Sequence, residues 1–200
     1  MYLRPAFAET DLERIAGLIA GHSFGVLVTV GEGGMSASHI PFLVAREGDA
    51  LMLEGHLGRG NPQCAQLDGG QGLAVFGGPH AYVSPAWYAT QPAVPTWDYV
   101  AVHLHGTLEV VDAPTAVHGM LRRLSAHDPG FDLDALDVGF RDGMVKGIQA
   151  FRLRATRIEA QWKMSQNRNA TDRKGVIAGL RASGENAVAD MMAATLPDGS

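Results

Sequence analysis

The spacing of apolar positions predicts one early helix followed by a mainly β chain. Thr10 and Glu13 form a capping box, and apolar residues at helical spacing continue to a stop at Gly21. Glycine-rich turn clusters then separate β-type runs, at distances typical of hairpins and not of parallel crossovers. These runs cover residues 24–30, 35–44, 50–55 and 72–83.

The clearest alternation lies in residues 98–111. One face of this predicted strand carries valine and leucine, and the opposite face carries His103, His105, Thr107 and Glu109. The first face is expected to pack on a core, which leaves the second face available for polar contacts.

The last predicted strand changes the parity of its apolar positions. Phe151 and Leu153 are odd-numbered, whereas Ala160 and Trp162 are even-numbered, so the buried face switches near Arg157 and a bulge or bend is expected there. Further helices are predicted after Pro114, in pieces up to Gly147, and over residues 171–180 and 185–196.

Short strands with helices at the start, middle and end favour an antiparallel barrel with helical decoration. We expect one barrel domain with inserted helices over residues 1–170 and a C-terminal helical extension over residues 171–200.

Composition is that of an ordinary globular protein: 200 residues, a net charge of -5, and 46% hydrophobic residues. The single cysteine, Cys64, excludes an intramolecular disulfide framework and favours the cytoplasm. Glu9 and Asp11 stand where a signal peptide would have its apolar core, and no run approaches the ~20 apolar residues of a membrane span.

The basic residues gather in one part of the chain. Residues 152–181 hold eight basic and two acidic side chains, so this segment could meet a phosphate-bearing ligand or DNA, or could be a solvated edge. The short helix predicted within it is interrupted by glycines, and no helix-turn-helix stands out.

A first candidate site is the loop that contains Arg59. Asn61 is a favoured helix N-cap, Pro62 a favoured first helical residue, and Gly58 and Gly60 allow a ligand to approach the backbone. Free amides beside a guanidinium suit a phosphate, although a plain turn before a helix explains the same residues. The Lys-Ser/Thr pair of a Walker A loop is missing.

Two further segments could meet a ligand. Residues 163–168 (Lys163-Met-Ser-Gln-Asn-Arg168) concentrate cations, a hydroxyl and amides directly after an apolar strand. Residues 77–88 and 94–99 are rich in aromatic side chains within a long connection, where they could stack on a flat ring or fill a subunit interface.

The eight histidines do not form a recognisable metal motif. His103 and His105 share a strand face, but HExxH and Cys/His clusters are missing, so we expect no metal site. A serine hydrolase is also disfavoured because the Gly-x-Ser-x-Gly motif does not occur. Haem stays open as an alternative ligand, although no histidine is singled out for it.

Six segments, in order, resemble the PaiB-type FMN-binding negative transcriptional regulators. They are Met1-Tyr2 with Pro5-Ala-Phe7, Ser38-His-Ile-Pro41, Gly55-His-Leu-Gly-Arg-Gly-Asn-Pro62, Gly78-Pro-His-Ala-Tyr-Val-Ser-Pro-Ala-Trp-Tyr88, Pro95-Thr-Trp-Asp-Tyr-Val-Ala-Val-His103 and Trp162-Lys-Met-Ser-Gln-Asn-Arg168. The resemblance extends to about Leu180. This chain departs from the family at Gly58 and Gly60, where alanine is commoner, and at Asp98, where asparagine is commoner.

The resemblance implies a split β-barrel, antiparallel and Greek-key-like, that forms homodimers with FMN between the subunits. The resemblance places three segments around the flavin: the strands with residues 29–39, the loop with residues 59–61, and the segment 163–168. The segment 163–168 would come from the same subunit or from the partner subunit. The implied cofactor-binding residues are Thr29, Ser36, Ser38, His39, Arg59, Gly60, Asn61, Lys163, Gln166, Asn167 and Arg168.

Two functions remain open at this stage. The resemblance implies an FMN-binding negative transcriptional regulator, whereas the fold equally accommodates a flavin-dependent oxidoreductase of the pyridoxamine-phosphate-oxidase type. No residue is marked as a catalytic acid or base, although His39, His56 and His103 have suitable chemistry. Direct DNA binding would depend on the basic segment alone. The substrate, the electron donor and the target genes are not readable from the sequence.

Overall fold

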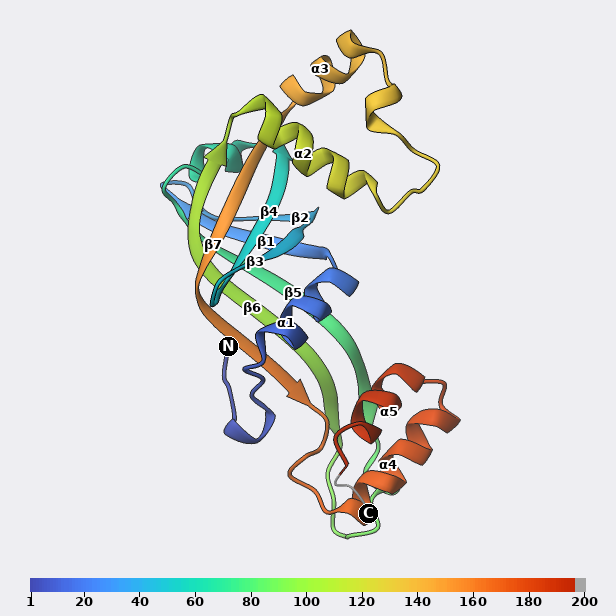
Figure 1. Cartoon of the computed structure of the whole chain (residues 1–200). Coiled ribbons are helices and arrows are strands. Elements are labelled where there is room, and N and C mark those ends of the chain that lie inside the picture. The colour runs from blue at the N-terminus through green and yellow to red at the C-terminus, as the bar shows by residue number, and fades with distance from the viewer. Residues whose placement is uncertain (197–200) are drawn as a thin grey trace. The chain divides into compact units, whose positions relative to one another are not determined.

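The computed structural model describes residues 1–196 and consists of strands with helices at several places along the chain (Figure 1). The strands are β1 (Phe24–Gly31), β2 (Gly34–Pro41), β3 (Leu43–Glu47), β4 (Ala50–Gly58), β5 (Gln71–Val83), β6 (Thr96–Val111) and β7 (Ile148–Lys163). The α-helices are α1 (Leu12–Gly21), α2 (Pro114–Ser125), α3 (Val138–Lys146), α4 (Ala170–Ala182) and α5 (Asn186–Ala193), and the 3-10 helices are η1 (Pro5–Phe7), η2 (Pro62–Gln66), η3 (Pro85–Trp87) and η4 (Leu133–Ala135).

The strands form one sheet in the order β2-β1-β5-β6-β7-β4-β3. The registers of β1 with β2, β1 with β5, β3 with β4 and β4 with β7 are all antiparallel. The mainly β fold with helical decoration is therefore confirmed. The single run predicted over residues 35–44 was wrong in detail, because the chain leaves β2 at Pro41 and Phe42 donates its N–H to Ser23 O before β3 begins.

The chain divides into two compact units. Unit 1 comprises Met1–Thr10, Gly77–Val102 and Glu159–Ser200, and unit 2 comprises Asp11–Phe76 and His103–Ile158. Strands β5, β6 and β7 each run through both units. The boundary expected at residue 170 falls at the start of α4, inside unit 1, and stays a prediction.

The early helix of unit 2 forms where expected, but its N-cap differs from the prediction. The side chain of Asp11, not that of Thr10, accepts from Glu13 N at 2.9 Å and Arg14 N at 3.4 Å. The Asp11 carboxylate satisfies two of the free amides and also complements the positive end of the helix. Ile15 and Ile19 then bury the apolar face of α1.

The core of unit 2 is built around three aromatic side chains, from β5, from β7 and from the link between β2 and β3. Phe42 meets Phe76 and Phe151 edge-on, with ring centroids 5.2 and 6.3 Å apart. Gly25 faces this cluster, and a Cβ there would lie 2.7 Å from the ring of Phe76. The core therefore requires glycine at this position of β1.

Unit 1 contains the helical pair α4 and α5, which pack against each other (Figure 1). Asn169 caps α4 by accepting from Asp172 N at 2.8 Å. The ring of Trp87 in η3 lies against α4 where Gly179 has no side chain, since a Cβ there would come within 2.3 Å of the indole.

Strand β7 shows the predicted change of buried parity. Phe151 and Leu153 are buried in its first half, and Ala160 and Trp162 in its second half. The assigned strand is continuous from Ile148 to Lys163, so the bulge stays a prediction. None of the helices in residues 1–196 has the length and apolar character that crossing a membrane requires.

Candidate functional site

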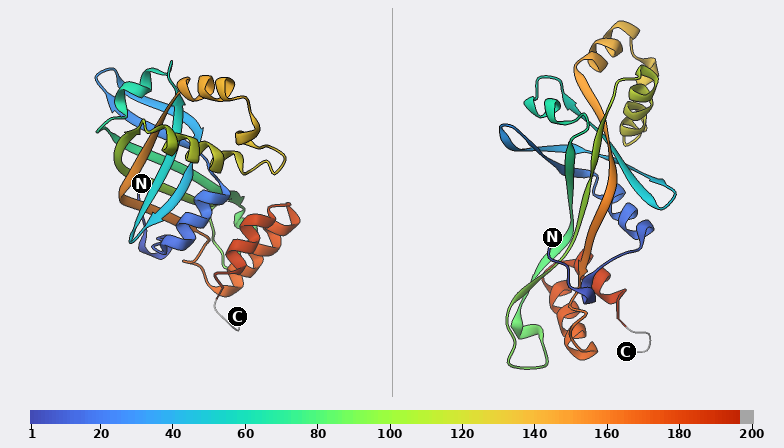
Figure 2. Two further views of the ribbon diagram at one scale, coloured as in Figure 1. Left: turned by 45° about the horizontal axis from the view of Figure 1, so that its top comes forward. Right: turned by 90° about the vertical axis from the view of Figure 1, so that its left-hand side faces the viewer.

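A network of hydroxyl and amide side chains joins η2 to the hairpin of β1 and β2 in unit 2, where the two elements lie side by side (Figure 2). Asn61 begins the network, because its Oδ1 accepts from Gln63 N at 2.9 Å and so caps η2. Its Nδ2 donates to Ser38 Oγ at 2.9 Å. The predicted residues Asn61 and Ser38 are thus in direct contact.

Gln63 is the centre of the network. Its side chain is 1% exposed, and its Oε1 accepts from Ser38 Oγ at 2.6 Å. Its Nε2 donates to Thr29 Oγ1 at 2.9 Å and to Leu27 O at 3.2 Å. One buried amide therefore fixes hydroxyls from two strands.

Gln66 completes the network on the next turn of η2. Its Oε1 accepts from Thr29 Oγ1, and its Nε2 donates to Ser36 Oγ at 3.2 Å. The structure thereby brings together four predicted site residues, Thr29, Ser36, Ser38 and Asn61. Sequence reasoning missed Gln63 and Gln66, although two amides three residues apart on a short helix share one face.

His39 and Gly60 do not join this network. Ser36 and Ser38 point to one face of β2 and His39 to the other, as alternation along a strand requires. The His39 ring stacks on Phe24 with centroids 6.3 Å apart. Gly60 lies in an exposed turn with open space around it.

Arg59 is anchored to the chain segment that enters β7. Its Nε donates to Lys146 O at 3.0 Å and its Nη1 to Gln149 Oε1 at 2.9 Å. Within residues 1–196 its guanidinium has no carboxylate partner, so its charge stays uncompensated. Burial raises the pKa of the nearby Cys64 thiol, and the positive charge of Arg59 partly opposes that rise.

The predicted segment 163–168 lies in unit 1, where it is organised by Asp98. This carboxylate is fully buried, and it accepts from Lys163 Nζ at 3.1 Å and Ser165 Oγ at 2.7 Å. Lys163 also donates to Thr96 Oγ1 at 2.7 Å. Ser165 has a positive φ of 53°, and its hydrogen bond to Asp98 helps to hold this unfavourable backbone conformation.

Gln166 folds back on its own loop. Its Oε1 accepts from Met164 N at 2.7 Å, and its Nε2 donates to Trp162 O at 2.6 Å. Arg168 instead lies over the ring of Tyr88, with Cζ 4.6 Å from the centroid. Lys163, Asn167 and Arg168 line a cavity of about 190 Å³ in unit 1, and Gln166 is not among its lining residues.

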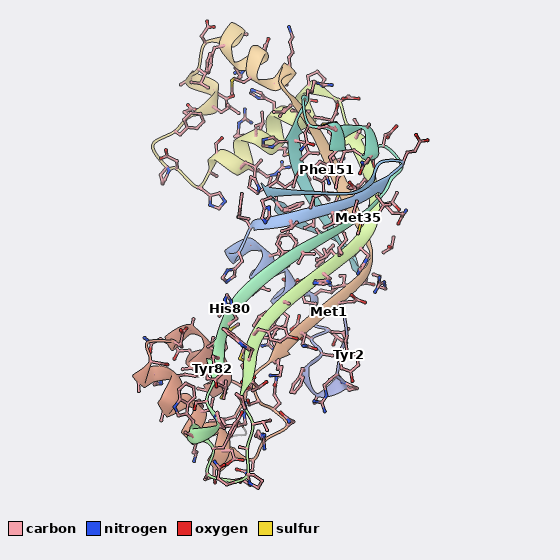
Figure 3. The ribbon with its side chains drawn as sticks, turned by 180° about the vertical axis from the view of Figure 1, so that it is seen from behind. Met1, Tyr2, Met35, His80, Tyr82 and Phe151 are labelled. Carbon is pink, nitrogen blue, oxygen red and sulfur yellow. The ribbon has the colours of Figure 1, made fainter. Side chains whose placement is uncertain are left out.

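The aromatic segment divides into buried and exposed parts. Tyr88 is buried and Trp87 packs on α4, whereas Tyr82 and Trp97 are exposed with their rings edge-on at 6.1 Å. His80 and Tyr82 follow each other along β5 (Figure 3). Only the exposed part is free to stack on a ring or meet another chain.

Among the histidines, His56 has a distinctive environment. It lines a largely apolar cavity of about 370 Å³ beneath α2 and α3, and its Nδ1 is buried without a hydrogen-bond partner in the described part of the chain. Burial lowers the pKa of His56, so the imidazole is neutral at physiological pH.

The basic segment is largely neutralised within the chain. Four of its side chains pair with carboxylates: Arg152 with Glu54, Arg154 with Glu47, Lys163 with Asp98 and Arg181 with Asp190. Arg173 is buried and donates to backbone carbonyls at the end of α5 and beyond it. Little of the segment is left as a free cationic surface for DNA.

The fold places the chain among split-barrel proteins. It aligns with the flavocytochrome Anf3 from Azotobacter vinelandii at a TM-score of 0.65 and 14% identity, covering 80% of this chain and 72% of that one. It also aligns with an FAD- and haem-binding protein from Mycobacterium smegmatis at a TM-score of 0.58 and 18% identity, covering 86% and 80% of the two chains. At these identities the likeness concerns the fold alone.

Sequence similarity assigns the family. Residues 1–157 match the family described as "Putative FMN-binding domain", and the chain belongs to that family. It is also 34% identical, over 99% of its own length and 97% of the relative, to "Protease synthase and sporulation protein PAI 2" from Bacillus subtilis. The family resemblance seen in the sequence is therefore confirmed.

The donor set of unit 2 fits the polar part of FMN. A ribityl phosphate offers hydroxyls and a dianion. The network offers hydroxyls and amides, and Arg59, two residues before Asn61 in the chain, adds a guanidinium that has no carboxylate partner within residues 1–196. Gly58 and Gly60 leave the adjoining turn free of side chains, with nothing within 4 Å of a Cβ at either position.

Proposed function

We propose that this chain is an FMN-binding split-barrel protein that acts as a negative transcriptional regulator, with the flavin held at a homodimer interface. The observation that carries the proposal is the hydroxyl and amide network of Thr29, Ser36, Ser38 and Asn61, which the family motif and the fold bring together.

Each part of the network has a role toward FMN in this proposal. Ser36, Ser38 and Asn61 would bind the ribityl chain, and Arg59 would pair with the phosphate. Bound FMN supplies hydride and single-electron chemistry at its ring. Gln63 holds the hydroxyls of Ser38 and Thr29, and Gln66 holds that of Ser36, so the hydroxyls are positioned before the cofactor arrives.

The dimer part of the proposal is supported by an exposed apolar face on the hairpin of β1 and β2. This is the face that carries His39, opposite the serine hydroxyls of β2, so it supports the dimer and not the position of the flavin. Val30 and Met35 pair across the hairpin and are 69% and 81% exposed, and Phe24 at the other end is 67% exposed. Met35 is labelled in Figure 3. β2 is an edge strand of the sheet. Such a face favours burial against a second copy, and Met35→Glu is expected to shift light-scattering mass from dimer to monomer.

The regulatory role is supported by the resemblance to PaiB-type regulators and by the Bacillus subtilis relative, whose name refers to protease synthesis and sporulation. Because the basic segment is mostly paired within the chain, we expect regulation to act through a partner or through the flavin state. Salt-dependent binding of the purified protein to promoter DNA would contradict that expectation.

The experiment that tests the FMN site is a titration of Arg59→Ala with FMN, with Arg46→Ala as the matched control. Arg46 is also in unit 2 but pairs with Glu13 on the surface. We expect at least a tenfold loss of affinity, about 1.4 kcal/mol, for Arg59→Ala alone. Equal affinities of the two folded variants would remove Arg59 from the site.

A flavin-dependent oxidoreductase is the second candidate, and His56 is the observation that favours it. A neutral imidazole with an unpartnered nitrogen at an apolar cavity is suited to accept a proton from a substrate. Bleaching of bound flavin by a reduced nicotinamide, slowed by His56→Gln, would support this function. Flavin that stays oxidised under anaerobic conditions with excess donor would count against it.

A further inference from the structure

A cavity of about 190 Å³ in unit 1 has the lining of an anion site. Its charged lining residues are Arg4, Lys163 and Arg168, and among the residues that the structure describes no carboxylate lines it. Asn167 contributes an amide, whereas the hydroxyl of Ser165 is donated to Asp98. The side chains that close it are those of Phe7, Tyr88, Val94, Pro95 and Thr96.

Lys163 is fixed in this lining by buried groups. All three N–H groups of its ammonium are engaged, because Asp98 accepts at 3.1 Å, Thr96 Oγ1 accepts at 2.7 Å, and the backbone oxygen of Trp97 also accepts. The ion pair balances the charge of Lys163, while the position of the ammonium at the cavity is fixed before any ligand binds. The other oxygen of Asp98 holds Ser165 at 2.7 Å in the same way.

The two arginines are held by aromatic rings and not by acids. Arg168 lies over Tyr88 at 4.6 Å and Arg4 over Phe7 at 5.5 Å. Neither has a carboxylate partner in residues 1–196. A guanidinium stacked on a ring keeps the N–H groups of its rim available to an oxyanion. Two uncompensated charges match the dianion of a phosphate monoester.

We propose that this cavity binds the phosphate group of a phosphate monoester, with Arg4 and Arg168 as the pairing cations and the side-chain amide of Asn167 as a further donor. The cavity is smaller than the about 300 Å³ from which pockets enclose a whole small molecule, so it takes the head group only. Lys163, Asn167 and Arg168 are also among the FMN-binding residues that the family resemblance implies, so the experiment must separate FMN from a second ligand. The proposal itself holds whether or not FMN regulates transcription.

Calorimetric titration of the FMN-free full-length protein with inorganic phosphate, at constant ionic strength, tests the site. We expect saturable binding that weakens at least tenfold in Arg168→Gln and in Arg4→Gln. Arg181→Gln is the matched control, because Arg181 lies in unit 1 but pairs with Asp190 on the surface. If Arg168→Gln fails to fold, Arg168→Lys replaces it in the titration, because lysine keeps the charge but lacks the forked guanidinium.

Absence of saturable phosphate binding to the wild-type protein would overturn the proposal, and so would equal binding by the wild type and both glutamine variants. Repeating the titration with FMN-saturated and riboflavin-saturated protein identifies the source of the phosphate. Competition by FMN but not by riboflavin assigns the cavity to the phosphate of FMN. Undiminished binding to the FMN-saturated protein assigns it to a second phosphorylated molecule, and both results support the site.

Discussion

The buried amide of Gln63 offers the sharpest test of how the polar network is held. Gln63→Ala leaves the hydroxyl of Ser38 without its acceptor and the hydroxyl of Thr29 without one of its donors, at a site that is almost closed to water. Each buried polar group left unpaired costs about 1–3 kcal/mol, so we expect a loss of about 3 kcal/mol. At about 2–4 °C per kcal/mol, the Tm should fall by about 6–12 °C.

Urea and thermal unfolding followed by circular dichroism measure this loss. Gln71→Ala is the matched control, because Gln71 lies in β5 of the same unit but is exposed, and its amide donates to the hydroxyl of Thr107 at 3.2 Å. Its substitution should change stability by less than about 0.5 kcal/mol. If the two variants unfold alike, the network contributes no stability and the account of its preorganisation is wrong.

Three further variants test other parts of the structure. Gly179→Ala should lower the free energy of unfolding by at least about 2 kcal/mol, because the new methyl group would meet the Trp87 ring. Gly17→Ala in α1 has open space and should raise that free energy by up to about 1 kcal/mol. Equal effects of the two substitutions in urea unfolding would refute the close approach of Trp87 to α4. Ser165→Ala should be less stable than Ser165→Gly by about 1 kcal/mol, because only glycine relieves the positive φ; a more stable alanine variant would contradict this reading of the loop. Because the pKa of His56 is lowered in the folded state, the unfolded chain takes up its proton first as pH falls below about 6.5, and the folded state loses stability. The difference in unfolding free energy between wild type and His56→Gln should therefore decline from pH 7.5 to pH 5, and a constant difference would show that this histidine titrates normally.

Local patterns predicted much of the fold. The apolar alternation of β6 buries Val102, Leu104 and Leu108 as expected, and the parity change in β7 is present. Where prediction failed, neighbouring residues offered equivalent chemistry. Thr10 and Asp11 can each cap α1, and only the backbone geometry selects Asp11.

The candidate site was only partly predictable. The hydroxyls of Ser36 and Ser38 were implied by the family resemblance. Gln63, the partner of Ser38, lies 25 residues further along the chain, and a hydrogen bond over that distance leaves no local pattern. The charge of residues 152–181 could not be interpreted from the sequence for the same reason. Partners such as Glu47 and Glu54 lie about a hundred positions earlier, so the segment looked free in the sequence.

The central claim is that the hydroxyl and amide network binds FMN. Its most direct test is the visible absorption spectrum of the purified protein during titration with FMN, for the wild type and for Ser38→Ala. We predict a shifted flavin band that saturates at one FMN per chain in the wild type, and at least tenfold weaker binding in the folded variant. A wild-type spectrum that stays that of free FMN, or equal affinity in both proteins, would contradict the account.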